Sequence, residues 1–200
     1  MIQKVHVGCG ATPIEEWLNV DAVQLPGVDR VLDVREGLPF RDLRLVYAEH
    51  FLEHLTLREG HRFLTECRAA LSDSGILRVS TPNLDYTWLT HYRHPSRLTE
   101  SEAIIGCLEM NRAFHGWGHK FLYNRGTLRH VLMKAGFATV NLWGYGESDV
   151  PELASLERHE KSGDSPDLPH VLIAQARGRS HERPFSKELL AEYRQAIDAR

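Results

Sequence analysis

The sequence is poor in the features that mark exported, membrane-bound or nucleic-acid-binding proteins. No hydrophobic run is long enough to span a bilayer, and the first residues form no apolar export signal. The three cysteines, Cys9, Cys67 and Cys107, are far apart and include no CxxC pair. Lys and Arg number 24 against 27 Asp and Glu, and they form no block. We therefore expect a cytoplasmic protein with reduced thiols and with neither a nucleic-acid nor a membrane partner.

The composition that is present fits one globular domain. At 200 residues, 42% hydrophobic and 26% charged, the chain can bury a core of its own. Short β-type runs alternate with helical ones, which is typical of an α/β fold with a mostly parallel sheet. We predict a Rossmann-like, doubly wound sheet of seven strands, with the last two paired at one edge and one of them antiparallel. The predicted strands are residues 4–7, 17–20, 28–34, 44–48, 75–81, 139–143 and 171–176.

Two helices and three special segments complete this organisation. Apolar residues at helical spacing predict a helix over 63–71 and another over 125–135, the second capped by Asn124 and ended by Gly136. The domain is expected over 1–178. Within it, 84–120 is a helical, aromatic-rich insert predicted to be a lid over the acceptor, and 146–169 a mobile loop. The tail, 179–200, is predicted to form a helix that docks on the domain or joins two subunits as a homodimer.

The side chains suited to ligand binding follow the first four predicted strands. They are the turn Gly8-Cys9-Gly10, Asp21, Asp33 and the pair Glu49-His50. In an open sheet, ligands bind at the carboxyl ends of the strands. Glycine lets the backbone approach a ligand, and a carboxylate can accept hydrogen bonds from ribose hydroxyls or an adenine amino group. The alternative is that the glycines only make a turn and the aspartates only cap helices. A dinucleotide fingerprint is disfavoured, because Pro13 replaces its third glycine.

Taken in order, six segments carry a family resemblance. They are VHVGCGATP, WLNVDA, DVREGLPF, VYAEHFLEHL, ECRAALSDSGILRVSTPN and LRHVLMKAGF. Over residues 5–175 the chain resembles class I S-adenosylmethionine-dependent methyltransferases, and is most similar to small bacterial predicted methyltransferases related to the type 11 group. The resemblance implies S-adenosyl-L-methionine as the cofactor. It also implies which residues bind it: Gly8, Cys9 and Gly10 at the methionine and ribose, Asp21 at the ribose, Asp33 and Val34 at the adenine, and Ala48, Glu49 and His50 at the sulfonium side.

Two positions depart from the pattern of that family. His6 stands where the family has an acidic residue, two places before the first glycine. The distance along the chain from Gly10 to Asp21 is short, so the first crossover helix must be abbreviated. Both departures bear on how tightly the cofactor is held.

Methyl transfer from a sulfonium needs alignment of the acceptor, exclusion of water and, for a hydroxyl acceptor, a base. The acceptor is expected to be a small molecule or a sugar or glycan-like compound. The candidate bases are His50, Glu53, His54, His115 and His119, and the catalytic set predicted here is His50, His54 and His119. The loop from His115 to His119 is predicted to fold over the methyl end of the donor beside His50. The alternative is an exposed loop without a function.

Two rival interpretations come from the same residues. His50-x-x-Glu53-His54 and His115-x-x-x-His119 have the spacing of metal ligands, which would suit a metal-assisted methyltransferase that uses His50, Glu53 and His54. The leading interpretation contains no metal. The second rival is a cofactor-binding or scaffold protein that keeps the fold without catalysis.

Overall fold

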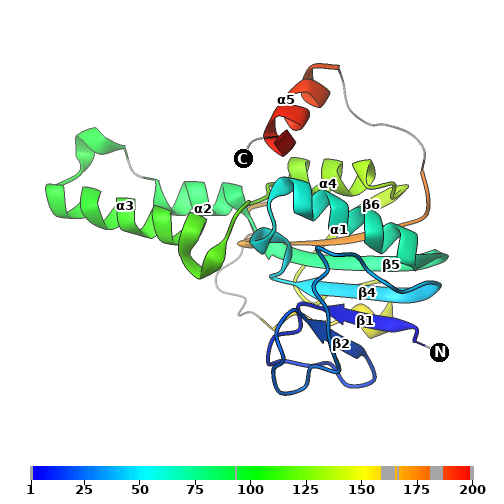
Figure 1. Cartoon of the computed structure of the whole chain (residues 1–200). Coiled ribbons are helices and arrows are strands. Elements are labelled where there is room, and N and C mark those ends of the chain that lie inside the picture. The colour runs from blue at the N-terminus through cyan, green and yellow to red at the C-terminus, as the bar shows by residue number, and fades with distance from the viewer. Residues whose placement is uncertain (1, 93, 159–164, 166, 181–186, 199–200) are drawn as a thin grey trace.

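The seven strands form a single sheet in the order β3-β2-β1-β4-β5-β7-β6 (Figure 1). This computed structural model describes residues 2–92, 94–158, 165, 167–180 and 187–198. The first five strands run parallel to one another, and β7 runs antiparallel to both β5 and β6. The predicted mostly parallel α/β sheet with an edge pair is therefore confirmed. The strands are β1 Lys4–Val7, β2 Leu18–Asp21, β3 Arg30–Val31, β4 Leu43–Glu49, β5 Leu71–Pro82, β6 Thr139–Trp143 and β7 Val171–Arg177.

The third strand is much shorter than the predicted 28–34. It lies at the edge of the sheet and pairs only with β2, through Val20 with Arg30 and Asp21 with Val31. The chain then turns, because the carbonyl of Asp33 accepts a hydrogen bond from the Glu36 amide at 3.0 Å. Asp33 therefore belongs to a turn at the end of β3 and not to the strand itself.

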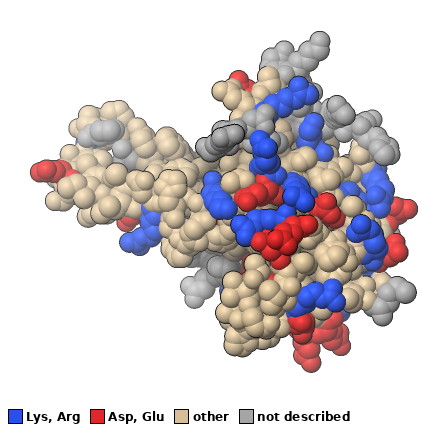
Figure 2. Space-filling view, viewed as in Figure 1, with Lys and Arg blue, Asp and Glu red and all other residues tan. Residues whose placement is uncertain are grey.

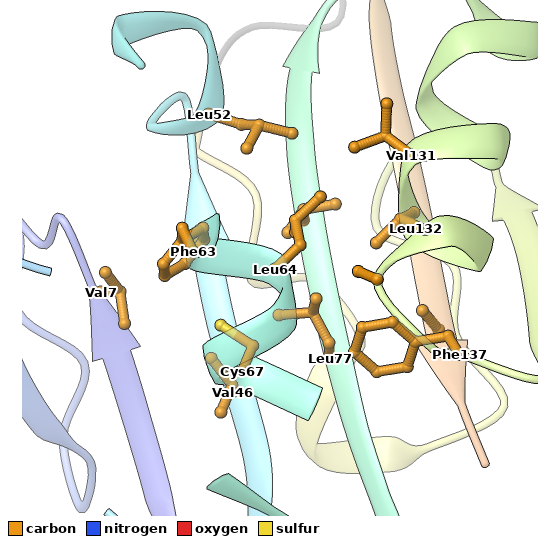
Figure 3. Close-up of a cluster of buried hydrophobic side chains, with 14 of the residues drawn as sticks. Val7, Val46, Leu52, Phe63, Leu64, Cys67, Leu77, Val131, Leu132 and Phe137 are labelled. Atoms are coloured by element: carbon orange, nitrogen blue, oxygen red, sulfur yellow. The ribbon is translucent and has the colours of Figure 1, made fainter. Parts of the chain in front are cut away.

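Helices α1 (Leu57–Ala70) and α4 (Arg125–Lys134) cover one face of the sheet. Both have N-caps that the sequence encodes: Thr56 and Glu59 form a capping box on α1, and the Asn124 side chain accepts a hydrogen bond from the Thr127 amide on α4. Gly136 ends α4 at φ +100°, as predicted. The apolar faces of the two helices meet the sheet in the main core, which Figure 3 shows around Phe63, Leu64, Cys67, Val131 and Leu132.

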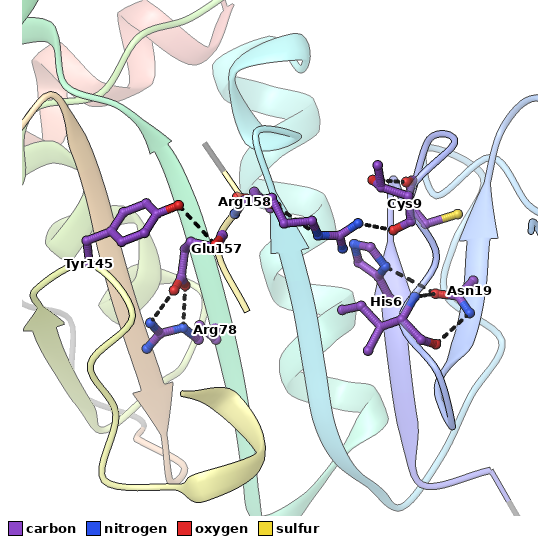
Figure 4. A network of polar contacts seen from close by, with 10 residues as sticks. His6, Cys9, Asn19, Arg78, Tyr145, Glu157 and Arg158 are labelled. Atoms are coloured by element: carbon purple, nitrogen blue, oxygen red, sulfur yellow. Dashed lines mark hydrogen bonds and ion pairs between the residues drawn. The ribbon is translucent and has the colours of Figure 1, made fainter. Parts of the chain in front are cut away.

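The opposite face of the sheet, called the polar face here, mixes buried polar side chains with apolar ones and carries no helix from the first crossover. Residues 8–17, which lie between β1 and β2, contain none, so the crossover predicted to be abbreviated has lost its helix. Residues 144–158, the covering segment, close this face instead (Figure 4). The segment contains the 3₁₀ turn η4 (Pro151–Leu153), and Leu153 packs in a second apolar cluster with Trp17 and Tyr47. Of the predicted loop 146–169, residues 159–164 and 166 lie outside the described part.

The insert after β5 forms an arm that projects from the sheet (Figure 1). Its elements are α2 (Leu84–His91), η2 (Pro95–Arg97), α3 (Glu100–His115) and η3 (Gly116–Gly118). In a closed lid the aromatic side chains of this insert would be buried. Trp88 and Trp117 are instead 50% and 72% exposed, and α3 buries none of its residues. The difference arises because α2 and α3 extend beyond the sheet, and Figure 2 shows the arm as largely uncharged surface.

The predicted C-terminal helix is α5 (Lys187–Asp198). Its Tyr193 is buried beside His61 of α1, with ring centroids 6.2 Å apart, so the helix docks on the domain. The side chains of Leu189, Leu190 and Ile197, on which the prediction relied, lie outside the described ones. No helix within the described ranges is long and apolar enough to cross a membrane.

Candidate functional site

The glycine turn after β1 adopts a backbone that few other residues could. Gly8 and Gly10 have φ values of +66° and +54°. The Gly8 amide donates to the carbonyl of Val20 at 2.9 Å, and the Gly10 amide donates to Asp21 Oδ2 at 2.9 Å. A Cβ at position 8 would lie 2.4 Å from Phe51 Cδ2. The turn is therefore held to the end of β2 on one side and packed against an aromatic ring on the other.

A cavity of about 170 Å³ opens beside this turn, at the carboxyl ends of β1 and β2. Five of the predicted residues line it: Gly8, Asp21, Asp33, Val34 and His54. Asp33 at its rim forms a two-pronged ion pair with Arg35, whose Nη2 lies 2.6 Å from Asp33 Oδ2. The hydrogen bonds from Arg35 lower the pKa of the Asp33 carboxyl, so this carboxylate stays ionised and paired with the Arg35 guanidinium.

Other predicted cofactor residues have different surroundings. Cys9 is buried, and burial raises the pKa of its thiol. Ala48 lies within β4, also buried. Glu49 is turned toward the covering segment, where its Oε1 accepts a hydrogen bond from the Arg158 amide at 2.7 Å. Gly10, Cys9, Ala48 and Glu49 are absent from the cavity lining, so they would act through the backbone or by shaping the turn. Their cofactor role stays a prediction.

His6, the residue that departs from the family pattern, points to the polar face and away from the cavity. It is 2% exposed, and its Nδ1 lies 3.2 Å from Asn19 Oδ1 (Figure 4). Burial lowers the pKa of His6 to about 4. The imidazole is therefore a neutral structural group that orients Asn19, whose amide nitrogen donates to the carbonyls of Ile14 and Trp17.

The predicted catalytic histidines surround a buried carboxylate, Glu53. This residue lies in the 3₁₀ turn η1 (Leu52–His54), directly after the cavity-lining Phe51. His50 precedes the turn at φ +44°, and its Nδ1 lies 3.0 Å from Glu53 Oε1. His54 lines the cavity, and its ring centroid is 5.3 Å from that of His119. His50, Glu53 and His54 share no helical face, because His50 lies outside η1 and Glu53 points into the core.

The loop from His115 to His119 brings only its last residue to this cluster. Trp117 at φ +61° and Gly118 at φ +80° turn the chain back. His119 Nδ1 then lies 2.9 Å from the carbonyl oxygen of Ala113. One group of side chains in the described residues has the arrangement of metal ligands, and it is Glu53, His54 and His119. The sets suggested by spacing, with His50 or with His115, are not the ones that converge.

Sequence reasoning missed several residues of the cavity. Phe51, Leu55, Arg35 and Lys120 line it together with the predicted ones. Lys120 comes from the end of the insert, where its amide donates to the Glu53 carbonyl at 2.7 Å. A position after a long insert gives no signal of this contact. Phe51 could have been found, since it lies two residues after the end of β4 and next to the predicted site residue His50. Asn83, directly after β5, is buried; its side chain donates to the Pro169 carbonyl and accepts from the Asp85 amide.

Comparison with known proteins supports the fold. No model of a known protein family matches the chain, and no curated protein matches it. Solved structures do. A SAM-dependent methyltransferase from Thermotoga maritima shares 16% identity over 88% of this chain and 81% of its own, with a TM-score of 0.57. Another from Mesorhizobium loti shares 19% over 88% and 90%, with a TM-score of 0.54. A third, from Archaeoglobus fulgidus, shares 18% over 88% and 86%, with a TM-score of 0.52. The chain thus has the Rossmann-like fold of S-adenosylmethionine-dependent methyltransferases.

Proposed function

We propose that this protein transfers the methyl group of S-adenosylmethionine to a small-molecule or sugar-like acceptor. The observation that carries the proposal is the cavity beside Gly8, in which Asp21 and Asp33 follow two successive strands of a methyltransferase-type sheet. Open α/β sheets bind their ligands at this edge. The three solved structures compared above are named as SAM-dependent methyltransferases, which supports the same reaction type.

Asp21 is suited to hold the ribose. Its Oδ2 accepts from the Gly10 amide at 2.9 Å and its Oδ1 from the Val23 amide at 3.0 Å. Each carboxylate oxygen has a further lone pair, so both can also accept ribose hydroxyls. Asp33 and Val34 then lie beside the adenine. The apolar wall of Phe51 and Leu55 would exclude water from the donor.

The reaction is an in-line displacement on the donor methyl. A lone pair of the acceptor forms the new bond to the methyl carbon while the carbon–sulfur bond breaks, and sulfur keeps that electron pair in S-adenosylhomocysteine. A hydroxyl or amine acceptor also loses a proton. His54 and His119 are the imidazoles placed between the cavity and the insert, so they would contact the acceptor and receive that proton.

An acceptor of modest size fits the charge of the protein better than a nucleic acid does. The face in Figure 2 carries Lys and Arg interspersed with Asp and Glu, and the arm beside the site is largely uncharged. A continuous basic track, which a phosphate backbone needs, is not present on that face. The imidazoles, by contrast, are suited to hydroxyl groups.

Calorimetry with S-adenosylhomocysteine tests the proposal. We expect one molecule of S-adenosylhomocysteine bound per chain. No binding at millimolar ligand would overturn both the proposed reaction and a cofactor-binding scaffold role. Binding without turnover of S-adenosylmethionine across a panel of sugar, phenol, amine and carboxylate acceptors would favour the scaffold.

A further inference from the structure

The strongest unassigned feature is the convergence of Glu53, His54 and His119. One ligand atom from each of them lies within 4.8 Å of the others. Two belong to η1, and the third comes from the far end of the arm, 65 residues later. Hydrogen bonds from the amides of Lys120 and Phe121 to the Glu53 carbonyl, at 2.7 and 3.2 Å, hold the two segments together. The cluster is therefore built by the fold and does not depend on a chance contact of side chains.

The hydrogen bonds around His119 fix which nitrogen can bind a ligand. A carbonyl oxygen only accepts, so the contact of 2.9 Å between His119 Nδ1 and the Ala113 carbonyl requires the proton on Nδ1. The lone pair then resides on Nε2. An imidazole whose far nitrogen donates to a backbone carbonyl is the usual state of a metal-binding histidine.

The carboxylate of Glu53 is also held in position by its neighbours. Glu53 is fully buried, and its Oε2 accepts a hydrogen bond from Thr81 Oγ1 at 3.0 Å. Its Oε1 is buried and lies 3.0 Å from His50 Nδ1. A buried carboxylate is costly unless a cation or donors compensate it. This buried carboxylate, which His50 and Thr81 hold in place and which converges with two further imidazoles, is therefore suited to hold a cation.

We propose that Glu53, His54 and His119 bind a first-row divalent metal ion. Two imidazoles and one carboxylate suit zinc, iron(II), cobalt(II) or manganese(II), whose bonds to such ligands are about 2.0–2.2 Å long. The three ligand atoms, now within 4.8 Å of one another, would move closer together around the ion. Three protein ligands leave coordination positions open. Because His54 also lines the cavity beside Gly8, we place those positions toward the cavity.

The consequence for catalysis rests on the proposed methyl transfer. An acceptor oxygen that coordinated the ion would have a lowered pKa and would release its proton to solvent water more easily, before the methyl group is transferred. In that case the lone pairs of His54 and His119 hold the ion, and the ion takes over the activation that a histidine base would provide. The favoured acceptor is then a compound whose methylated hydroxyl has a second oxygen next to it.

The test is titration of the metal-free full-length protein with Co²⁺ and Zn²⁺. We expect one equivalent of Co²⁺ to bind with visible d–d absorption, and Zn²⁺ to displace it. Glu53→Gln, His54→Ala and His119→Gln should each weaken binding by about 100-fold or more. His130→Ala, which removes a histidine of α4 outside the cluster, is the matched control and should bind as the wild type.

Circular dichroism of each variant shows whether it still folds, and His119→Gln changes a half-buried side chain, so it provides the test if Glu53→Gln unfolds. Absence of Co²⁺ binding up to about 100 µM, or binding that the three substitutions leave unchanged, would overturn the proposal. S-adenosylhomocysteine calorimetry on the same samples separates the two hypotheses. If the protein binds the metal but not S-adenosylhomocysteine, the proposed methyl transfer is wrong and the ion site stands. If it binds S-adenosylhomocysteine but not the metal, only the proposed ion site is wrong.

Discussion

Arg78 and Glu157 form a two-pronged ion pair inside the protein, with Arg78 Nε 2.6 Å from Glu157 Oε1 and Nη2 2.9 Å from Oε2. Arg78 belongs to β5 and Glu157 to the covering segment, and their side chains are 0% and 1% exposed (Figure 4). Tyr145 also donates to the Glu157 carbonyl at 3.0 Å. The pair therefore fastens the covering segment to the polar face of the sheet, where the first crossover supplies no helix.

Breaking this ion pair should cost far more stability than breaking an exposed one. Glu157→Gln leaves the Arg78 charge buried without compensation, and we expect a loss of about 3–5 kcal/mol in the free energy of unfolding. Glu152→Gln is the matched control, since Glu152 of the same segment pairs with Arg44 at the surface, and it should cost at most about 1 kcal/mol. Urea denaturation measures both. Equal effects of the two substitutions would contradict the account.

Alanine substitutions at the two glycines of the turn, Gly8 and Gly10, should destabilise the protein to different extents. Gly8→Ala adds a Cβ that would lie 2.4 Å from Phe51, at a φ of +66°. Gly10→Ala has a similar φ, but no atom lies within 4 Å of its Cβ. We expect Gly10→Ala to destabilise by about 1 kcal/mol and Gly8→Ala by clearly more, with the excess relieved in Gly8→Ala/Phe51→Ala. Thermal unfolding of the three variants is the measurement, and an excess that persists in the double variant would exclude the steric cause.

Part of this architecture could be predicted from the sequence, because local signals encode it. The parallel strands follow from β-type runs, and the ends of α4 follow from Asn124 and Gly136, whose roles depend on their immediate neighbours. The covering segment could not be predicted. Its attachment depends on Glu157 meeting Arg78, which is 79 residues away in sequence. The same holds for the cluster, in which the spacing within the chain pointed to His50 and His115, whereas the fold brings Glu53 and His54 to His119.

The buried imidazole of His6 predicts how stability changes with pH. Its pKa is about 4 in the folded protein, lowered by burial, against 6.5 for an unperturbed histidine. Between these values the unfolded chain binds a proton that the folded protein does not, so stability falls as the pH falls from about 6.5 toward 4. The loss should reach about 3 kcal/mol at the lower limit.

The variant His6→Gln isolates this effect, because all other titrating groups remain. We expect the wild-type free energy of unfolding, measured in urea at several pH values, to decline more steeply than that of His6→Gln between pH 6.5 and 4. Parallel curves would show that His6 is protonated in the folded protein as readily as in the unfolded chain.

Cofactor affinity should depend on both carboxylates at the cavity. Asp21→Ala and Asp33→Ala should each weaken S-adenosylhomocysteine binding by about 1–3 kcal/mol, through loss of hydrogen bonds to a charged acceptor. Asp149→Ala, at an exposed ion pair with Arg177, is the control and should bind as the wild type. Calorimetry gives the affinities. Unchanged affinity in both cavity variants would show that the cofactor does not bind in this cavity.

His119 should affect catalysis and leave cofactor binding nearly untouched. Its ring lies next to His54 at the side of the cavity that adjoins the insert, whereas the carboxylates that would hold the cofactor are on β2 and after β3. Whether it takes a proton or holds an ion, it acts on the acceptor. His119→Ala should therefore lower kcat/KM by about 10²-fold or more, while affinity for S-adenosylhomocysteine stays within about threefold.

His115→Ala in the same loop is the comparison, since His115 does not reach the cluster. Wild-type turnover in His119→Ala would remove the loop from the mechanism, and a parallel loss of cofactor affinity would show that His119 shapes the donor pocket instead.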